Sequence, residues 1–130
     1  MLTLLALTFG VNAGLDARQQ VPPQGVPAPA ARGTVSGTLV VAGAHGTLEW
    51  RLTVHRLTGR VRALELRRGS LGRRGPLLER LCGPCGPRGT ARLDGPAVAA
   101  IRGGRAYVTV TTRRNPRGEI RGRLRLLGGA

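Results

Sequence analysis

The two cysteines of the chain, Cys82 and Cys85, have the spacing of a dithiol site. They enclose a Gly-Pro pair, and this Cys-Gly-Pro-Cys spelling occurs in redox motifs. Redox chemistry of that kind needs a low-pKa thiolate at the N-terminus of a helix that directly follows a strand. The sequence instead continues with Gly-Pro-Arg-Gly, which does not favour a helix. We therefore predict a structural disulfide that closes a small loop, with a redox site and half of a metal site as the alternatives.

Other side chains that could carry out catalysis are sparse. His45 and His55 are too few for a closed zinc site without both cysteines. Neither serine, Ser36 nor Ser70, lies in a nucleophile-elbow sequence. No two acidic residues have a spacing typical of an acid/base pair; they are Asp16, Glu49, Glu65, Glu79, Asp94 and Glu119. We expect no enzymatic activity, no metal and no cofactor, and we expect Glu119 to form an ion pair with a neighbouring arginine.

Arginine supplies all 21 basic residues of the chain, and the formal net charge is +15. Arg121, Arg123 and Arg125 alternate along one predicted strand, so they would lie roughly 6.5 to 7 Å apart on one face and could bind phosphates or sulfates. The adjoining turn would extend this patch with Arg113, Arg114 and Arg117, and a second patch could form from Arg67, Arg68, Arg73 and Arg74. The alternative is a solvated edge strand on which charge prevents aggregation, in a chain whose lack of Lys indicates compositional bias. Because no aromatic residues interleave with these arginines, we expect no specific nucleic-acid partner.

The elements that position these side chains are predicted to be strands. Short β-prone runs separated by Gly, Pro and Asn follow Gly33, and no segment has a helical apolar period of sufficient length. Leu48, Trp50 and Leu52 alternate with polar residues, as in a half-buried strand. We expect an all-β antiparallel sandwich or barrel of about seven short strands, covering residues 34–41, 46–57, 60–67, 77–81, 88–93, 106–113 and 119–127. The second and third runs would form one hairpin, the last two would form another, and residues 96–102 would form one short helical turn.

The N-terminal residues 1–10 are apolar and uncharged, which is typical of the apolar region of an export signal. Sites similar to Ala-x-Ala end at Ala13 and Ala17, so we predict a signal peptide over residues 1–17 and a secreted or extracytoplasmic protein. Since no basic residue precedes the apolar run, the alternatives are a true start further upstream or an apolar strand of the domain. Residues 18–32 are rich in Pro, Gln and Ala and predict a disordered or polyproline-like linker. The folded domain would then cover residues 33–128.

A longer pattern near the C-terminus resembles a known family. The string from Gly104 to Thr112, followed by the string from Asn115 to Gly122, is similar to the C-terminal signature of the CHRD domain, which is named for chordin and is common in exported bacterial proteins. Trp50, a run of spaced glycines and the cysteine pair fall in the family's order, so the resemblance covers about residues 33–127. The positions that carry the signature are Tyr107, Thr112, Gly118, Glu119, Arg121 and Gly122. The resemblance implies an immunoglobulin-like β-sandwich or barrel without established enzymatic activity, and it transfers no partner.

The chain departs from this family at three positions. Members usually carry a His-x-His pair ahead of the spaced glycines and a further His just before the last Thr of the Tyr-Val motif. This sequence has Glu65, Arg67 and Thr111 at those places. If the histidines serve metal or proton chemistry in relatives, that role is lost here, because Glu65 alone cannot hold a transition metal tightly.

These observations favour an exported, non-catalytic interaction module of the CHRD type. Its partner would be a protein or an anionic polymer of the cell envelope, and the mature chain would have no transmembrane span. Two alternatives come from other classes: a basic module that binds polyanions through its arginine stripes, and an enzyme that uses the cysteine pair or a metal.

Overall fold

The computed structural model of the chain describes residues 5–20, 23–69 and 73–127. Within these residues the chain forms strands and one helix, in the order β1 (Ala6–Asp16), β2 (Arg32–Ala42), β3 (His45–His55), β4 (Ala63–Arg68), β5 (Leu77–Cys82), β6 (Arg88–Leu93), α1 (Gly95–Arg102), β7 (Ala106–Thr111), β8 (Ile120–Arg123) and β9 (Arg125–Leu127). All of the strand pairs are antiparallel. The all-β class is therefore confirmed, with nine strands in the described part instead of about seven.

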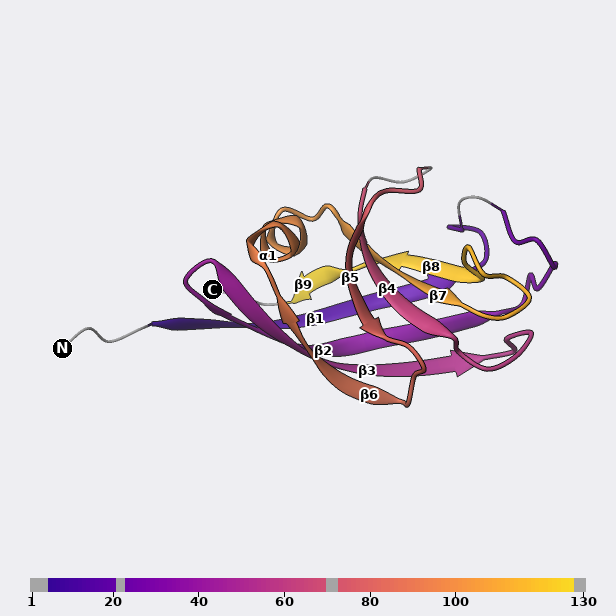
Figure 1. The fold of residues 1–130 in the computed structure, drawn as a ribbon, viewed down its shortest axis with the longest axis horizontal. Coiled ribbons are helices and arrows are strands. Elements are labelled where there is room, and N and C mark those ends of the chain that lie inside the picture. Colours follow the sequence, from indigo (N-terminus) through magenta and orange to yellow (C-terminus); the bar gives the residue numbers. More distant parts are fainter. Residues whose placement is uncertain (1–4, 21–22, 70–72, 128–130) are drawn as a thin grey trace.

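The strands form one sheet that bends over on itself. The hydrogen-bonded order is β5-β4-β7-β8-β1-β2-β3-β6, with β9 as a further partner of β1. In Figure 1 the strands β4 and β5 cross over the long strands β2 and β3. The end strands β5 and β6 contact each other, so the sheet is a nearly closed barrel. The apolar core lies inside it, around side chains such as Leu39, Leu48, Leu64 and Val108.

The local pattern of β3 follows its sequence. Leu48, Trp50 and Leu52 are buried in the core, while Glu49 and Arg51 between them are exposed. The predicted hairpin between β3 and the following strand is wrong, however. Residues 56–62 form a loop that starts with Arg56 at a positive φ of 57°, and β4 pairs with β5 and β7 instead. The second predicted hairpin is present as β7 and β8.

The apolar N-terminal segment is a strand of the domain. β1 pairs with β2 along its whole length, from Ala6 opposite Ala42 to Asp16 opposite Arg32, and β8 and β9 pair with its other edge. Its inward side chains are buried in the core; they are Phe9, Val11, Ala13 and Leu15. The expected domain start at residue 33 is therefore wrong, because an apolar run with period-two alternation serves equally as a strand. Removal of residues 1–17 would remove β1 from the interior of the sheet.

The Pro-rich segment is also part of the folded domain in its described residues. The Gln24 side chain donates to the carbonyl oxygen of Glu119 at 2.6 Å. Asn115 accepts from the Val26 backbone N–H at 2.7 Å and donates to the Val26 carbonyl at 3.0 Å. Ala31 is buried in the core. The expectation of a disordered linker is thus wrong here, since long-range hydrogen bonds hold the segment.

The predicted helical turn is confirmed as α1. The Asp94 side chain caps it by accepting from the Ala97 N–H at 3.0 Å, Pro96 lies in the first turn, and Gly103 ends the helix. Ala97 and Ile101 pack into the core. With eight residues α1 is short, and in the part of the chain described no helix has the length and hydropathy to cross a membrane.

Candidate functional site

The strands β4, β7 and β8 have two buried faces. One faces the apolar core with Leu64, Leu66, Val108, Val110 and Ile120. The strand register places a second set of side chains on the opposite face. That set is polar yet largely buried: Glu65, Arg67, Tyr107, Thr109, Thr111 and Arg121. A covered polar face of this kind is the first candidate for a functional site.

Arg121 and Tyr107 form the centre of this face. The Arg121 guanidinium lies 3.4 Å from the centroid of the Tyr107 ring, a cation–π contact. Arg121 also donates to the Arg73 carbonyl oxygen at 2.5 Å, and the Tyr107 hydroxyl accepts from the Gly75 N–H at 2.7 Å. Burial lowers the pKa of Arg121, and the electrostatic interaction with Tyr107 acts in the opposite direction. Both side chains therefore fix residues 73–75 on the sheet.

The three positions at which the family resemblance leads us to expect histidine lie on this same face. Arg67 and Glu65 form an ion pair at 3.1 Å, and Arg67 also donates to the Gly75 carbonyl at 2.8 Å. Thr111 is buried one row further along, opposite Ala63. The structure thus brings Glu65 and Arg67 into contact. Thr111 lies on the neighbouring strand β7, two residues beyond Thr109, the partner of Glu65. Among the described residues no group of three or more His, Cys, Asp or Glu side chains could hold a metal ion.

Glu119 lies in a separate buried network, and its expected ion pair with an arginine is wrong. Its carboxylate accepts from the backbone N–H of Thr58 at 2.8 Å and from the Thr58 hydroxyl. It also accepts from the Thr112 hydroxyl and the Asn115 amide, both at 2.9 Å. Burial by itself raises the pKa of Glu119, but the hydrogen bonds from Thr58, Asn115 and Thr112 together outweigh burial and lower it. Glu119 therefore joins the residue 58 loop to the turn before β8.

Steric constraints explain why glycine occupies the signature positions 118 and 122. Gly118 has a φ of +131°, which favours glycine. At Gly122 a Cβ would collide with the backbone carbonyl of Gly14 on β1. The signature positions at Thr112, Gly118, Glu119 and Gly122 thus maintain the turn and the contact between β8 and β1.

The predicted arginine ladder is only partly present. Arg123 and Arg125 are exposed, but Arg121 is 2% exposed because Tyr107 and residues 73–75 cover it. The strand is also interrupted at Leu124, which separates β8 from β9. The ladder prediction is therefore wrong for Arg121, since strand alternation cannot show that a distant loop covers a face.

The arginines of the turn between β7 and β8 lie on the surface, close to other arginines that the sequence spacing did not indicate. Arg113, Arg114 and Arg117 are exposed. Arg113 and Arg114 line a hollow of about 600 Å³ together with Arg60 and Arg62 from the β3–β4 connection. The pairing of distant loops produces this group, so the only signal in the sequence was the high arginine content.

A second hollow of about 550 Å³ lies on the outer face of β2, β3 and β6. Arg51 is directly opposite Arg88 there, and Ser36 is directly opposite Arg51. Like charges opposite each other are unfavourable, and Glu49 is the only carboxylate among the described residues that line the hollow. Neither Arg51 nor Arg88 was among the predicted anion-binding residues, because their pairing depends on the register.

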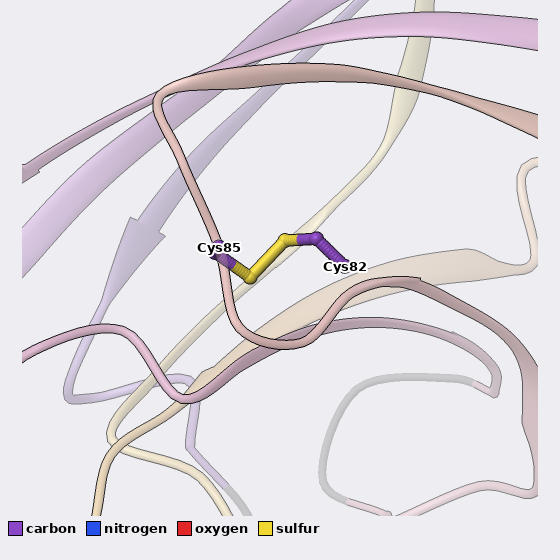
Figure 2. Close-up of a disulfide and its surroundings, with 2 residues drawn as sticks. All are labelled: Cys82 and Cys85. Atoms are coloured by element: carbon purple, nitrogen blue, oxygen red, sulfur yellow. A yellow bond between two sulfur atoms is a disulfide. The ribbon is translucent and has the colours of Figure 1, made fainter.

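The cysteines form a disulfide, as predicted. Cys82 ends β5 and Cys85 lies in the turn before β6, with an S–S distance of 2.00 Å (Figure 2). Both side chains are half-buried against the core. The chain continues from Cys85 into β6, so the pair lacks the following helix that lowers a thiol pKa in dithiol redox sites.

The comparisons with known proteins identify a family. The family model described as CHRD domain matches residues 11–124, from the middle of β1 to the residue between β8 and β9. No curated protein and no solved structure matches the chain. The chain belongs to the CHRD domain family.

Proposed function

We propose that this protein is a non-catalytic CHRD-domain module that acts outside the cytoplasm and binds an anionic polymer. The observation that carries the proposal is the lack of neutralisation at the surface: in the described part of the chain, no exposed arginine forms a salt bridge. A net charge of +15 that is not internally compensated attracts polyanions and accelerates their association.

The distribution of the acidic groups supports this proposal. Glu119 is buried in its own network, and Glu65 is paired with Arg67. Asp16 and Asp94 accept backbone N–H groups of Gln19 and Ala97, each at 3.0 Å. Few carboxylates are therefore placed to oppose the exposed arginines, which also gather around shared hollows.

The use of the buried polar groups supports a non-catalytic role. Tyr107, Arg121 and Arg67 each contact the backbone of residues 73–75. Glu119 is saturated by donors from its own domain. These side chains hold the loops in place and have the partners that a structural role needs.

The location outside the cytoplasm is proposed from the Cys82–Cys85 disulfide alone. Disulfides persist in oxidising compartments and are rare in the cytosol. The proposal does not include cleavage within residues 1–17, because β1 forms part of the core.

Chromatography of the folded, disulfide-bonded protein tests the proposal. We expect retention on immobilised heparin but not on neutral dextran, with elution by salt. If about four charges are neutralised, the affinity should fall roughly 100-fold between 50 and 200 mM salt. Absence of retention at 50 mM salt, or retention that salt does not change, would refute the proposal.

A further inference from the structure

A third hollow, of about 540 Å³, lies where β4 and β8 end beside the start of β7. Its size is within the range of small-molecule sites. None of the described residues that line it carries a carboxylate; they are Gln19, Arg68, Gly69, Gly104, Arg105, Tyr107, Arg121 and Arg123. The hollow is thus lined by arginines from separate parts of the chain.

Three exposed arginines line the hollow from adjacent strand ends. Arg68 is the last residue of β4, Arg123 is the last residue of β8, and Arg105 directly precedes β7. Ala106, the residue after Arg105, is opposite Arg68, and Tyr107 is opposite Arg123. The Gly69 N–H donates to the Arg105 carbonyl at 2.8 Å, which holds these strand ends together.

Arg121 contributes an anchored positive charge to the lining of the hollow. The buried Arg121 stacks on the Tyr107 ring and is anchored to the Arg73 carbonyl. Gly104 has a φ of +70°, and a Cβ at this position would lie 2.5 Å from the Arg123 guanidinium. Glycine at residue 104 therefore leaves the space that the Arg123 side chain occupies.

The chemistry of the lining indicates the class of ligand. Guanidinium groups bind the oxygens of sulfate and phosphate through paired N–H donors. The Tyr107 ring is already in contact with Arg121, and no other aromatic side chain lines the hollow among the described residues, so a nucleobase has no platform for stacking. The volume leaves room for a sugar ring in addition to the anionic group.

We propose that this hollow binds a sulfate- or phosphate-bearing sugar unit of an anionic polysaccharide. The inference rests on the proposed function and locates it: Arg68, Arg105 and Arg123 bind the oxyanion, above the fixed charge of Arg121.

Two triple variants with the same net charge test this assignment. One replaces Arg68, Arg105 and Arg123 by Ser, and the matched control replaces Arg18, Arg56 and Arg92, which are exposed and line none of the three hollows, by Ser. Titration calorimetry would use a sulfated heparin disaccharide, glucose 6-phosphate, glucose and inorganic sulfate, and urea unfolding would check that both variants fold. We expect the hollow variant to lose at least tenfold in affinity for the charged sugars, while the control stays within twofold of the wild type.

A milder variant, Arg123→Lys, retains the charge but loses the planar fork, so we expect an affinity between those of the wild type and the triple variant.

Tighter binding of the disaccharide than of glucose 6-phosphate would support a sulfated sugar, and the reverse order a phosphorylated one. Equal losses in both triple variants would overturn the assignment while leaving the proposed function intact. Inorganic sulfate bound as tightly as the sugars would overturn the sugar site. Tighter binding of a single-stranded oligonucleotide at the hollow would overturn the polysaccharide, and no binding of any polyanion by the wild type would refute the proposed function itself.

Discussion

Replacement of Glu119 by Gln should destabilise the protein, although it changes the side chain by little more than one charge. The carboxylate has two oxygens that accept four hydrogen bonds, and the amide has one oxygen. If the amide oxygen takes the place of Oε1, the bonds from Thr112 and Asn115 remain, and the new NH₂ group faces the Thr58 N–H.

The expected cost follows from that mismatch. An unsatisfied buried donor costs about 1–3 kcal/mol, and Thr58 is only half-buried, so water can partly compensate. We therefore expect Glu119→Gln to lower the free energy of unfolding by about 1–3 kcal/mol at pH 7. Glu119→Ala leaves all of these donors unpaired and should cost about 3–5 kcal/mol, a large fraction of the stability of a small domain.

Urea unfolding followed by Trp50 fluorescence measures both effects. The control is Glu49→Gln on the exposed face of β3, which should change stability by no more than about 0.5 kcal/mol. A Glu119→Gln protein as stable as this control would refute the network as described.

The pH dependence gives an independent test of the same carboxylate. Its pKa in the folded protein lies below the ordinary value of 4.5. The unfolded chain therefore takes up a proton before the folded protein does, so the stabilisation is present above about pH 4.5 and is lost as the pH falls through the folded pKa. The wild type should lose more stability below about pH 4.5 than Glu119→Gln does. Equal losses in the two proteins would contradict a lowered pKa.

Three further changes test the fold. Deletion of residues 1–17 should abolish cooperative unfolding in urea, because it removes β1 from the interior of the sheet; a stable, cooperative truncated protein would contradict this placement. Gly122→Ala should lower the melting temperature strongly, because its Cβ would collide with the Gly14 carbonyl, whereas Gly14→Ala meets no atom within 4 Å and should change it little. Reduction of the Cys82–Cys85 disulfide should cost about 2 kcal/mol by the chain-entropy estimate for so short a loop, and an unchanged urea midpoint would argue against it.

Much of the architecture was predictable because it depends on local patterns. Alternation in β3, the turn signals between β7 and β8, and the Pro and Gly residues around α1 each act over a few residues. The resemblance to the CHRD signature also rested on a short segment. These predictions agree with the structure at the level of strand or helix identity.

The errors occurred where distant segments decide the outcome. An apolar stretch such as residues 6–16 fits the pattern of an export signal and that of a strand equally well. Only its pairing with β2, β8 and β9 distinguishes the two. The linker prediction failed because Asn115, some 90 positions away, binds Val26.

The candidate binding site shows the same limit. Strand alternation placed Arg121 on the outward face correctly, but the cover provided by residues 73–75 is a tertiary contact. The groups at Arg68, Arg105 and Arg123, and at Arg51 and Arg88, arise from strand pairing. No spacing along the sequence could have brought them together.

The most direct test of the central claim, that this CHRD domain binds an anionic polymer, is titration calorimetry with heparin and with the same heparin after chemical desulfation. The folded, disulfide-bonded protein should bind the sulfated polymer, roughly 100-fold more weakly at 200 mM than at 50 mM salt. It should bind the desulfated polymer far more weakly. Equal affinity for the two polymers, or no binding of either at 50 mM salt, would contradict the account.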